Sequence, residues 1–154
     1  MSTFTNLLFH IVYSTKYRKR TIRPEWQDEL YGYVGGIVRD QKGTLLKIGG
    51  VEDHVHLLAK LSPTIAVSDV LRKIKSNSSK WINERPDVSR TFEWQSGYAA
   101  FSVSESQSPS VSDYIGSQAE HHRKMTFEEE FLAILRKHNI EFDKRYVFEQ
   151  EIIE

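Results

Sequence analysis

Residues 44–61 of this chain, TLLKIGGVEDHVHLLAKL, determine how the elements around them can be arranged. The two ends of this stretch, residues 44–48 and 54–61, are rich in β-branched and apolar side chains, which favour β-strands. The residues between them, 49–53, include two glycines and an aspartate, which favour a turn. The stretch therefore predicts a β-hairpin.

The strand predicted over residues 54–61 has two different faces. Side chains at positions i and i+2 of a strand point to the same side, about 7 Å apart, so His54 and His56 share one face. The opposite face is apolar along its whole length. Its side chains are Val55, Leu57, Ala59 and Leu61. We expect the apolar face to join the core and the two histidines to face outward.

The elements on either side of the hairpin alternate between strands and helices. The predicted order is a strand over residues 4–15, a helix over 24–42, the hairpin, a helix over 67–84, a strand over 98–104 and helices over 109–122 and 126–139. The first six elements match the split βαβ arrangement. We predict an α+β fold, with a ferredoxin-like antiparallel sheet whose first and third strands are central neighbours. Two helices would cover one face and leave the other free for function or for the additional C-terminal helices.

Length and composition predict one globular domain over residues 1–154. The chain has 154 residues, of which 39 % are hydrophobic and 27 % charged. It contains no cysteine, which excludes disulfides, cysteine-ligated zinc and a thiol nucleophile and suits a cytoplasmic location. The longest apolar stretch, around residues 7–13, is too short to span a membrane, and the pattern does not predict a signal peptide.

Basic residues are concentrated in the first part of the chain. Residues 1–90 contain 15 Lys and Arg against 9 Asp and Glu, whereas residues 91–154 contain 6 against 12, so the net charge of zero conceals an asymmetry. Two basic clusters, residues 16–23 and 72–80, could bind a phosphate backbone, or they could form ordinary solvated faces. The aromatic residues that could stack on unpaired bases are Tyr17, Trp81 and Trp94.

Two pairs of residues could carry chemistry. His54 and His56 could hold one cation between their rings, although such a pair also arises by chance. Tyr114 and Gln118 lie four residues apart in a predicted helix and share one face. A tyrosine needs a metal ion or a base to attack phosphorus, and a glutamine offers a neutral oxygen to a cation. Alternatively, Tyr114 packs in the core and Gln118 is solvated.

The other histidines have structural interpretations. His10 is in phase with the apolar residues of the first strand, so we expect a core histidine, although it would face the histidine pair if the strands were neighbours. His121 and His122 point in different directions on a helix, which favours structural or capping roles. His138 lies at the end of the last helix, where the helix dipole favours a positive charge.

Several segments together carry a family resemblance. The segment HVHLL at residues 54–58 resembles the histidine–hydrophobic–histidine signature of the single-tyrosine HUH transposases of bacterial and archaeal insertion sequences, the REP-associated tyrosine transposase superfamily. Four other segments resemble the same family in the same order: HIVYSTKYRK (10–19), SSKW (78–81), WQSGYAAFSVS (94–104) and YIGSQAEHH (114–122). The resemblance covers essentially the full length of the chain.

This resemblance implies an enzyme that cuts single-stranded DNA at hairpin-marked element ends and rejoins the strands. Tyr114, on the additional C-terminal helices, matches the nucleophile, which would form a 5′-phosphotyrosine and release a 3′-hydroxyl. His54, His56 and Gln118 match the ligands of a Mg²⁺ or Mn²⁺ ion. The family works as homodimers, in which the tyrosine helix of one subunit commonly completes the site of the other.

The resemblance also implies a positive surface for DNA. The candidate side chains are Arg18, Lys19, Arg72, Lys75 and Lys80. Residues 128–130 are all acidic, and we expect them to form a repulsive face turned away from DNA. Two other functions stay open: a domesticated protein that binds structured single-stranded DNA or RNA without transposing, and a small metal hydrolase that would not need Tyr114.

Overall fold

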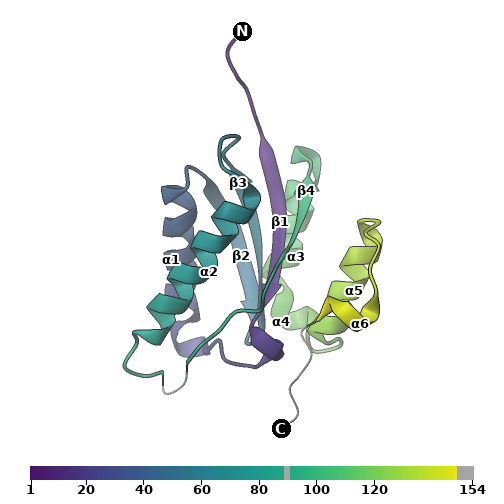
Figure 1. The fold of residues 1–154 in the computed structure, drawn as a ribbon. Coiled ribbons are helices and arrows are strands. Elements are labelled where there is room, and N and C mark those ends of the chain that lie inside the picture. The colour runs from purple at the N-terminus through teal and green to yellow at the C-terminus, as the bar shows by residue number, and fades with distance from the viewer. Residues whose placement is uncertain (89–90, 149–154) are drawn as a thin grey trace.

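The computed structural model describes residues 1–88 and 91–148, which contain a four-stranded antiparallel sheet (Figure 1). Its strands are β1 (Leu7–Ser14), β2 (Thr44–Val51), β3 (His54–Leu61) and β4 (Ala99–Val103). The order across the sheet is β2-β3-β1-β4. The hairpin and the central position of the first and third strands are therefore confirmed.

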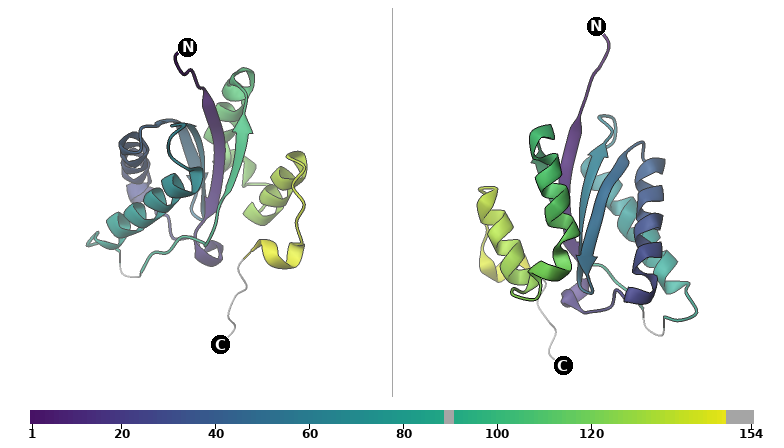
Figure 2. Two further views of the ribbon diagram at one scale, coloured as in Figure 1. Left: turned by 45° about the horizontal axis from the view of Figure 1, so that its top comes forward. Right: turned by 180° about the vertical axis from the view of Figure 1, so that it is seen from behind.

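Helices lie on both sides of the sheet (Figures 1 and 2). The first face is covered by α1 (Pro24–Asp40) and α2 (Val67–Asn83). On the other side lie α3 (Ser108–Gly116) and α4 (Gln118–His121), and α5 (Phe127–Lys137) is beside β4. The shorter elements are η1 (Lys16–Arg18), η2 (Glu105–Gln107) and α6 (Lys144–Val147). The predicted α+β class is confirmed. None of the helices in the described ranges is both long and apolar enough to cross a bilayer.

The first face of the sheet carries the main core. Tyr13 of β1 and Leu57 of β3 pack there with Leu30 of α1 and Ile74 of α2, and all four are less than 2 % exposed. Val55 lies on the same face of β3, as the alternation predicted. Burying these side chains removes a large apolar area from water, so this layer provides much of the driving force for folding.

The second face carries a smaller core and the polar side chains. Phe127 and Phe131 of α5 pack there with Val12 of β1 and Phe101 of β4. Val12 pairs directly with His56 across the sheet, so the histidine face of β3 and the Val12 face of β1 are the same surface. The C-terminal helices therefore cover the surface that carries the histidines.

The hairpin turn is tighter than predicted. β2 continues through Val51, and the turn is formed by Glu52 and Asp53, whereas we expected a turn over residues 49–53. Gly49 is needed for another reason: a Cβ at this position would lie 2.2 Å from the carbonyl oxygen of Ile115 in α3. A glycine inside a strand often marks a close approach of another backbone, and here that backbone carries the tyrosine.

The predicted helix over residues 109–122 is interrupted. Ser117 has φ −107° and ψ 20°, which separates α3 from α4, so Tyr114 and Gln118 lie on two different helices. The prediction of one continuous helix is therefore wrong. Gly116 directly precedes the break, and glycine has a low helix propensity. The predicted capping box at Thr126 and Glu129 is confirmed at the start of α5.

We predict that Gly49→Ala destabilises the protein by about 2 kcal/mol or more, because the new methyl group forces α3 away from β2. Gly32→Ala in α1 is the matched control. No atom lies within 4 Å of the Cβ that this change adds, and alanine favours the helix by about 0.5–1 kcal/mol. Urea unfolding of both variants measures the difference, and equal stability of the two would contradict the close approach.

Candidate metal centre and nucleophile

His54 and His56 are fully buried on the second face of the sheet. They point away from the main core, as the alternation predicted, but they do not face solvent. Phe127 of α5 covers one of them, since its ring centroid is 4.4 Å from that of His54. The expected outward-facing pair is thus an internal pair, because the C-terminal helices close over it.

Glu130 of α5 lies at the centre of this buried region and is 2 % exposed. Its Oε1 is 3.0 Å from His56 Nε2, 3.4 Å from His54 Nε2 and 3.1 Å from His122 Nε2. The expectation that residues 128–130 form a repulsive outer face is wrong for this residue. The sequence contained a sign that Glu130 is buried, because this residue lies on the apolar stripe of α5. The stripe follows helical spacing and includes Phe127, Phe131 and Ile134.

Tyr114 and Gln118 reach the same carboxylate in spite of the helix break. The Tyr114 hydroxyl donates a hydrogen bond to Glu130 Oε2, and Gln118 Nε2 donates to the same oxygen at 3.0 Å. Gln118 Oε1 then lies 2.8 Å from His54 Nε2. Gln118 is buried and Tyr114 half-buried. The structure therefore brings together the four residues Tyr114, His54, His56 and Gln118 that the sequence singled out.

Two further histidines belong to this site. His122 Nε2 is 3.1 Å from Gln118 Oε1, and His122 Nδ1 is 2.9 Å from the carbonyl oxygen of Met125. His10 Nε2 is 2.8 Å from His56 Nδ1, on the second face of the sheet. The core interpretation of His10 and the capping interpretation of His122 are therefore incomplete. We call His54, His56, Gln118, His122 and Glu130 the donor cluster.

The remaining two histidines lie next to the cluster. The ring of His121 packs on the ring of Tyr114, with 4.7 Å between centroids. His138 stacks on Phe101 of β4 at 4.2 Å. Both contacts are structural, in agreement with the sequence interpretation of His121.

Burial and hydrogen bonding set the charges of the histidines. Burial lowers the pKa of His56, and burial together with the neighbouring His56 lowers the pKa of His10 to about 3, so both rings are neutral. Burial also opposes a charge on His54, but hydrogen bonds to Asp53 and to two other polar side chains outweigh it and raise its pKa to about 9. Asp53 Oδ1 is 2.6 Å from His54 Nδ1.

Glu130 and Tyr114 have opposite protonation states. Burial raises the pKa of Glu130, but hydrogen bonds from His54 and His56 outweigh it and hold the pKa well below its usual range. The side chain is therefore a carboxylate. Burial and the adjacent Glu130 raise the pKa of Tyr114, so its hydroxyl keeps its proton at neutral pH.

The donor chemistry of the cluster fits a divalent cation. His54, His122 and Glu130 each offer a ligand atom, and these atoms all lie within 4.8 Å of one another. Imidazole nitrogens and carboxylate or amide oxygens are common ligands of divalent ions. His54 also has the outer partner typical of a metal-ligating histidine, since the Asp53 carboxylate fixes its ring through Nδ1.

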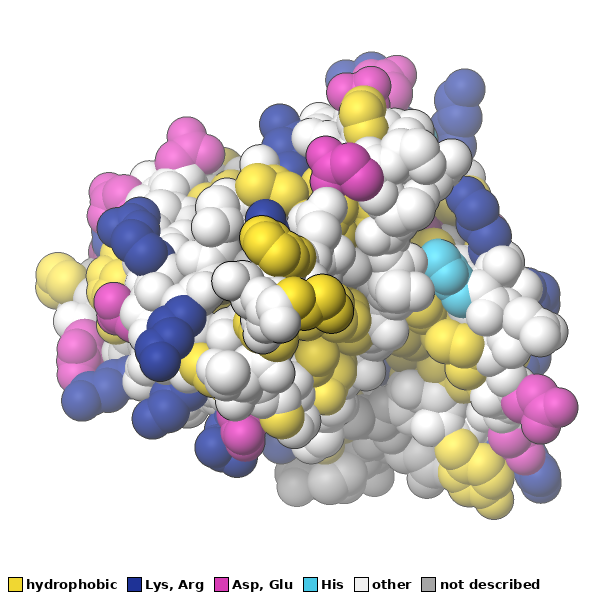
Figure 3. Space-filling view, turned by 90° about the horizontal axis from the view of Figure 1, so that it is seen from above, with side chains coloured by type: hydrophobic (Ala, Val, Ile, Leu, Met, Phe, Trp, Pro, Cys, Tyr) yellow, Lys and Arg dark blue, Asp and Glu magenta, His cyan; other side chains and the backbone are white. Residues whose placement is uncertain are grey.

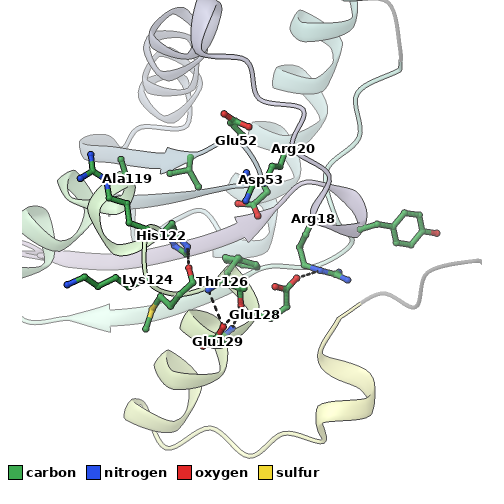
Figure 4. A pocket seen from close by; sticks show the side chains of 15 residues that line it. Arg18, Arg20, Glu52, Asp53, Ala119, His122, Lys124, Thr126, Glu128 and Glu129 are labelled. Atoms are coloured by element: carbon green, nitrogen blue, oxygen red, sulfur yellow. Dashed lines mark hydrogen bonds and ion pairs between the residues drawn. The ribbon is translucent and has the colours of Figure 1, made fainter.

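Two cavities flank the cluster. The first, about 660 Å³, reaches His122 and Asp53 and is lined by the basic side chains Arg18, Arg20 and Lys124 (Figure 4). The second, about 640 Å³, is lined by Tyr114, His10 and Glu130 together with apolar side chains of α3 and α5. Seen from above, the surface is hollowed to the right of its centre, with a histidine beside apolar side chains (Figure 3).

The basic residues proposed for DNA lie in two separate places. Arg18 of η1 lines the first cavity and forms an ion pair with Glu128 at 2.5 Å, and Lys19 follows it in an exposed position. Arg72, Lys75 and Lys80 lie on α2, on the opposite face of the sheet. On this α1–α2 side of the molecule, Lys and Arg side chains are interspersed with Asp and Glu side chains (Figure 3, left).

The aromatic residues differ in their availability for stacking. Trp94 is 9 % exposed and donates from Nε1 to the Ser78 hydroxyl at 2.9 Å, so it is part of the main core. Trp81 is half-buried and stacks on Tyr33 of α1. The interpretation of Trp94 as an exposed stacking partner is therefore wrong.

This fold occurs in a solved tyrosine transposase. The structure of a REP-associated tyrosine transposase bound to a REP hairpin matches all of this chain and all of its own length, with a TM-score of 0.61 and 15 % identity. The family model described as "Transposase IS200 like" matches residues 3–118. The chain therefore belongs to the IS200-like transposase family, and the predicted family is confirmed.

Two sequence relatives are transposases of the same kind. The ISDra2 transposase TnpA of Deinococcus radiodurans is 26 % identical over 117 residues, which cover 73 % of this chain and 84 % of the relative. The IS200 transposase of Salmonella typhimurium is 26 % identical over 121 residues, which cover 75 % and 78 % of the two chains. The family match includes Tyr114 and Gln118 but ends before His122 and Glu130.

We predict that Glu130→Ala destabilises the metal-free protein by about 3 kcal/mol, because several buried polar groups lose their shared partner. Glu129→Ala on the same helix removes only a contact of the capping box and costs at most about 1 kcal/mol. Urea unfolding in EDTA gives both values. Equal effects of the two substitutions would show that the buried carboxylate contributes no special stabilisation.

Proposed function

We propose that this chain is an active single-strand DNA transposase that cleaves and rejoins hairpin-marked element ends through a 5′-phosphotyrosine at Tyr114. The observation that carries the proposal is the junction at Glu130, where the Tyr114 hydroxyl meets the side chains of His54, His56 and Gln118. A potential nucleophile and potential ligands of a phosphate-polarising ion converge there. Membership of a transposase family supports the same activity.

In the proposed reaction, Tyr114 Oη attacks the scissile phosphorus. A bond forms between Oη and phosphorus, and the bond from phosphorus to the 3′-oxygen breaks. The hydrogen bond to Glu130 Oε2 positions the hydroxyl, and its proton passes to solvent during the attack. The 3′-oxygen leaves as a hydroxyl after it takes a proton from solvent. Rejoining reverses these steps, so the energy of the broken bond is kept in the phosphotyrosine.

His54, His56 and Gln118 would hold a Mg²⁺ or Mn²⁺ ion in this site. When bound there, a divalent ion polarises the phosphate and stabilises the negative charge that develops during attack. Asp53 and His10 fix the rings of His54 and His56 through their Nδ1 atoms. The side chains therefore need little reorganisation when the ion binds.

The proposed substrate is single-stranded DNA with a hairpin near each end. The solved REP-associated transposase is bound to a REP hairpin, and the basic residues Arg18, Lys19, Arg72, Lys75 and Lys80 are candidates for phosphate contacts in this chain. A cavity of about 640 Å³ lies beside Tyr114, and we propose that an unpaired strand enters it. Tyr114 lies beside the histidines of its own chain, and we propose a homodimer that holds two DNA ends together.

We predict that labelled hairpin DNA forms a covalent adduct with the protein in Mg²⁺ or Mn²⁺, visible on a denaturing gel. Tyr114→Phe abolishes the adduct because the nucleophilic oxygen is removed, and His56→Ala abolishes it because a ligand is lost. Tyr33→Phe is the control, since Tyr33 lies on α1 at the opposite face of the sheet.

Other results of this experiment would favour other functions. Hairpin binding without an adduct on several substrates would support a protein that binds structured nucleic acid without transposing. DNA hydrolysis that survives Tyr114→Phe would support a metal hydrolase.

We predict that Arg72→Ala with Lys80→Ala weakens hairpin binding about equally for different hairpin sequences. Phosphate contacts release counterions, so the slope of log K against log salt should fall by about one for each contact removed. Arg145→Ala is the control, because this exposed residue lies on α6, away from α2 (Figure 1). Fluorescence anisotropy at several salt concentrations measures the slope. An unchanged slope would show that Arg72 and Lys80 of α2 do not contact the phosphates of the DNA.

A further inference from the structure

We infer that His122 and Glu130 contribute ligands to the metal site and that Mn²⁺ binds there more tightly than Mg²⁺. This inference rests on the proposed function, because it extends the set His54, His56 and Gln118. Both added residues lie beyond residue 118, where the family match ends. The site is therefore assembled in part from a segment that the match does not include.

The tautomers of two histidines support this assignment. His54 Nδ1 lies 2.6 Å from the Asp53 carboxylate, and His122 Nδ1 lies 2.9 Å from the carbonyl oxygen of Met125. Both partners accept hydrogen bonds, so Nδ1 is the donor atom of each ring and Nε2 is the atom left to bind a cation. These two Nε2 atoms lie 2.8 Å and 3.1 Å from Gln118 Oε1. Three potential ligand atoms therefore lie together.

The other members of the cluster are oriented in the same way. Gln118 Nε2 donates to Glu130 Oε2, and this bond fixes the amide so that its oxygen faces the histidine nitrogens. His56 Nδ1 is 2.8 Å from His10 Nε2, so His56 can donate to His10 and present its own Nε2 lone pair to the cluster. Glu130 contributes the carboxylate oxygen Oε1, which lies 3.0 Å from His56 Nε2 and 3.1 Å from His122 Nε2.

The spacing of several neighbouring donor atoms is that of adjacent ligands in a coordination shell. Neighbouring donors are 2.8 Å apart for His54 Nε2 and Gln118 Oε1, 3.0 Å for His56 Nε2 and Glu130 Oε1, and 3.1 Å for His122 Nε2 and either oxygen. In octahedral geometry with bonds of about 2.1 Å, adjacent ligand atoms are about 3 Å apart.

The donor types set the preference among ions. Mg²⁺ prefers oxygen ligands and keeps several of its waters, which a buried site with three imidazoles does not favour. Mn²⁺ binds carboxylate oxygens readily, and it binds nitrogen ligands more tightly than Mg²⁺ does. The cluster offers three nitrogens and two oxygens. We therefore expect Mn²⁺ to bind at least about tenfold more tightly than Mg²⁺.

Glu130 would also connect the ion to the nucleophile. Its Oε1 faces the histidines and its Oε2 accepts the hydrogen bond of the Tyr114 hydroxyl, so one carboxylate joins both parts of the site. The docking of α5 fixes this position, because Phe127 and Phe131 anchor the helix in the second core on either side of Glu130. Glu130 is thus a ligand and, for Tyr114, a positioning residue.

Isothermal titration of the EDTA-treated full-length protein with Mn²⁺ and with Mg²⁺, without DNA, tests this assignment. We expect Glu130→Gln and His122→Asn each to weaken Mn²⁺ binding by about tenfold or more, because each removes one ligand. Glu129→Gln is the matched control, since it keeps the capping box and lies outside the cluster. Far-UV circular dichroism confirms that each variant is folded.

Three results would overturn the assignment. If both variants bound Mn²⁺ like the wild type while His54→Ala lost binding, the ligands would be confined to the other cluster members. If Mg²⁺ bound as tightly as Mn²⁺, the donor set would not be the one inferred, and wild-type protein that bound neither ion would exclude the site altogether. None of these results depends on DNA. A failure of the proposed metal ligands can therefore be distinguished from a failure of the proposed transposase activity, which the adduct experiment tests.

Discussion

The carboxylate of Glu130 is the buried charge around which the second face of the sheet is organised. A buried anion is costly unless its oxygens are paired, and a partly paired one is worse than an apolar core. Its two oxygens are satisfied by groups from β3, α3, α4 and the segment that follows α4, namely His54, His56, Tyr114, Gln118 and His122. The contacts that stabilise the charge are therefore the same contacts that assemble the site.

The two faces of the sheet divide the tasks of stability and chemistry. The α1–α2 face buries a large apolar core. The other face has a smaller core, and α3 is pressed so closely onto β2 that only glycine fits at position 49. A rigid sheet thus separates the stable layer from a layer in which three helices position polar side chains.

The periodicity of the sequence predicted most of the fold, because strands and helices follow local rules. The hairpin, the central β1 and β3, the covering of one face by α1 and α2 and the cap at Thr126 all follow from the spacing of apolar and polar residues. The exact length of the turn and the break between α3 and α4 were not predicted. The close approach of α3 to β2 at Gly49, a contact between segments more than 60 residues apart, could not be read from local spacing either.

The sequence by itself determined the fold class, the shared face of His54 and His56 and, through motif resemblance, the choice of Tyr114 and Gln118. Only the tertiary structure showed that this face is buried, that His10 and His122 join it and that Glu130 is its anionic centre. The physical reason is that strand alternation is local, whereas the pairing of a buried charge is set by partners distant in the chain. A glutamate on an apolar helical stripe indicates that such partners exist, and the fold decides which side chains they are.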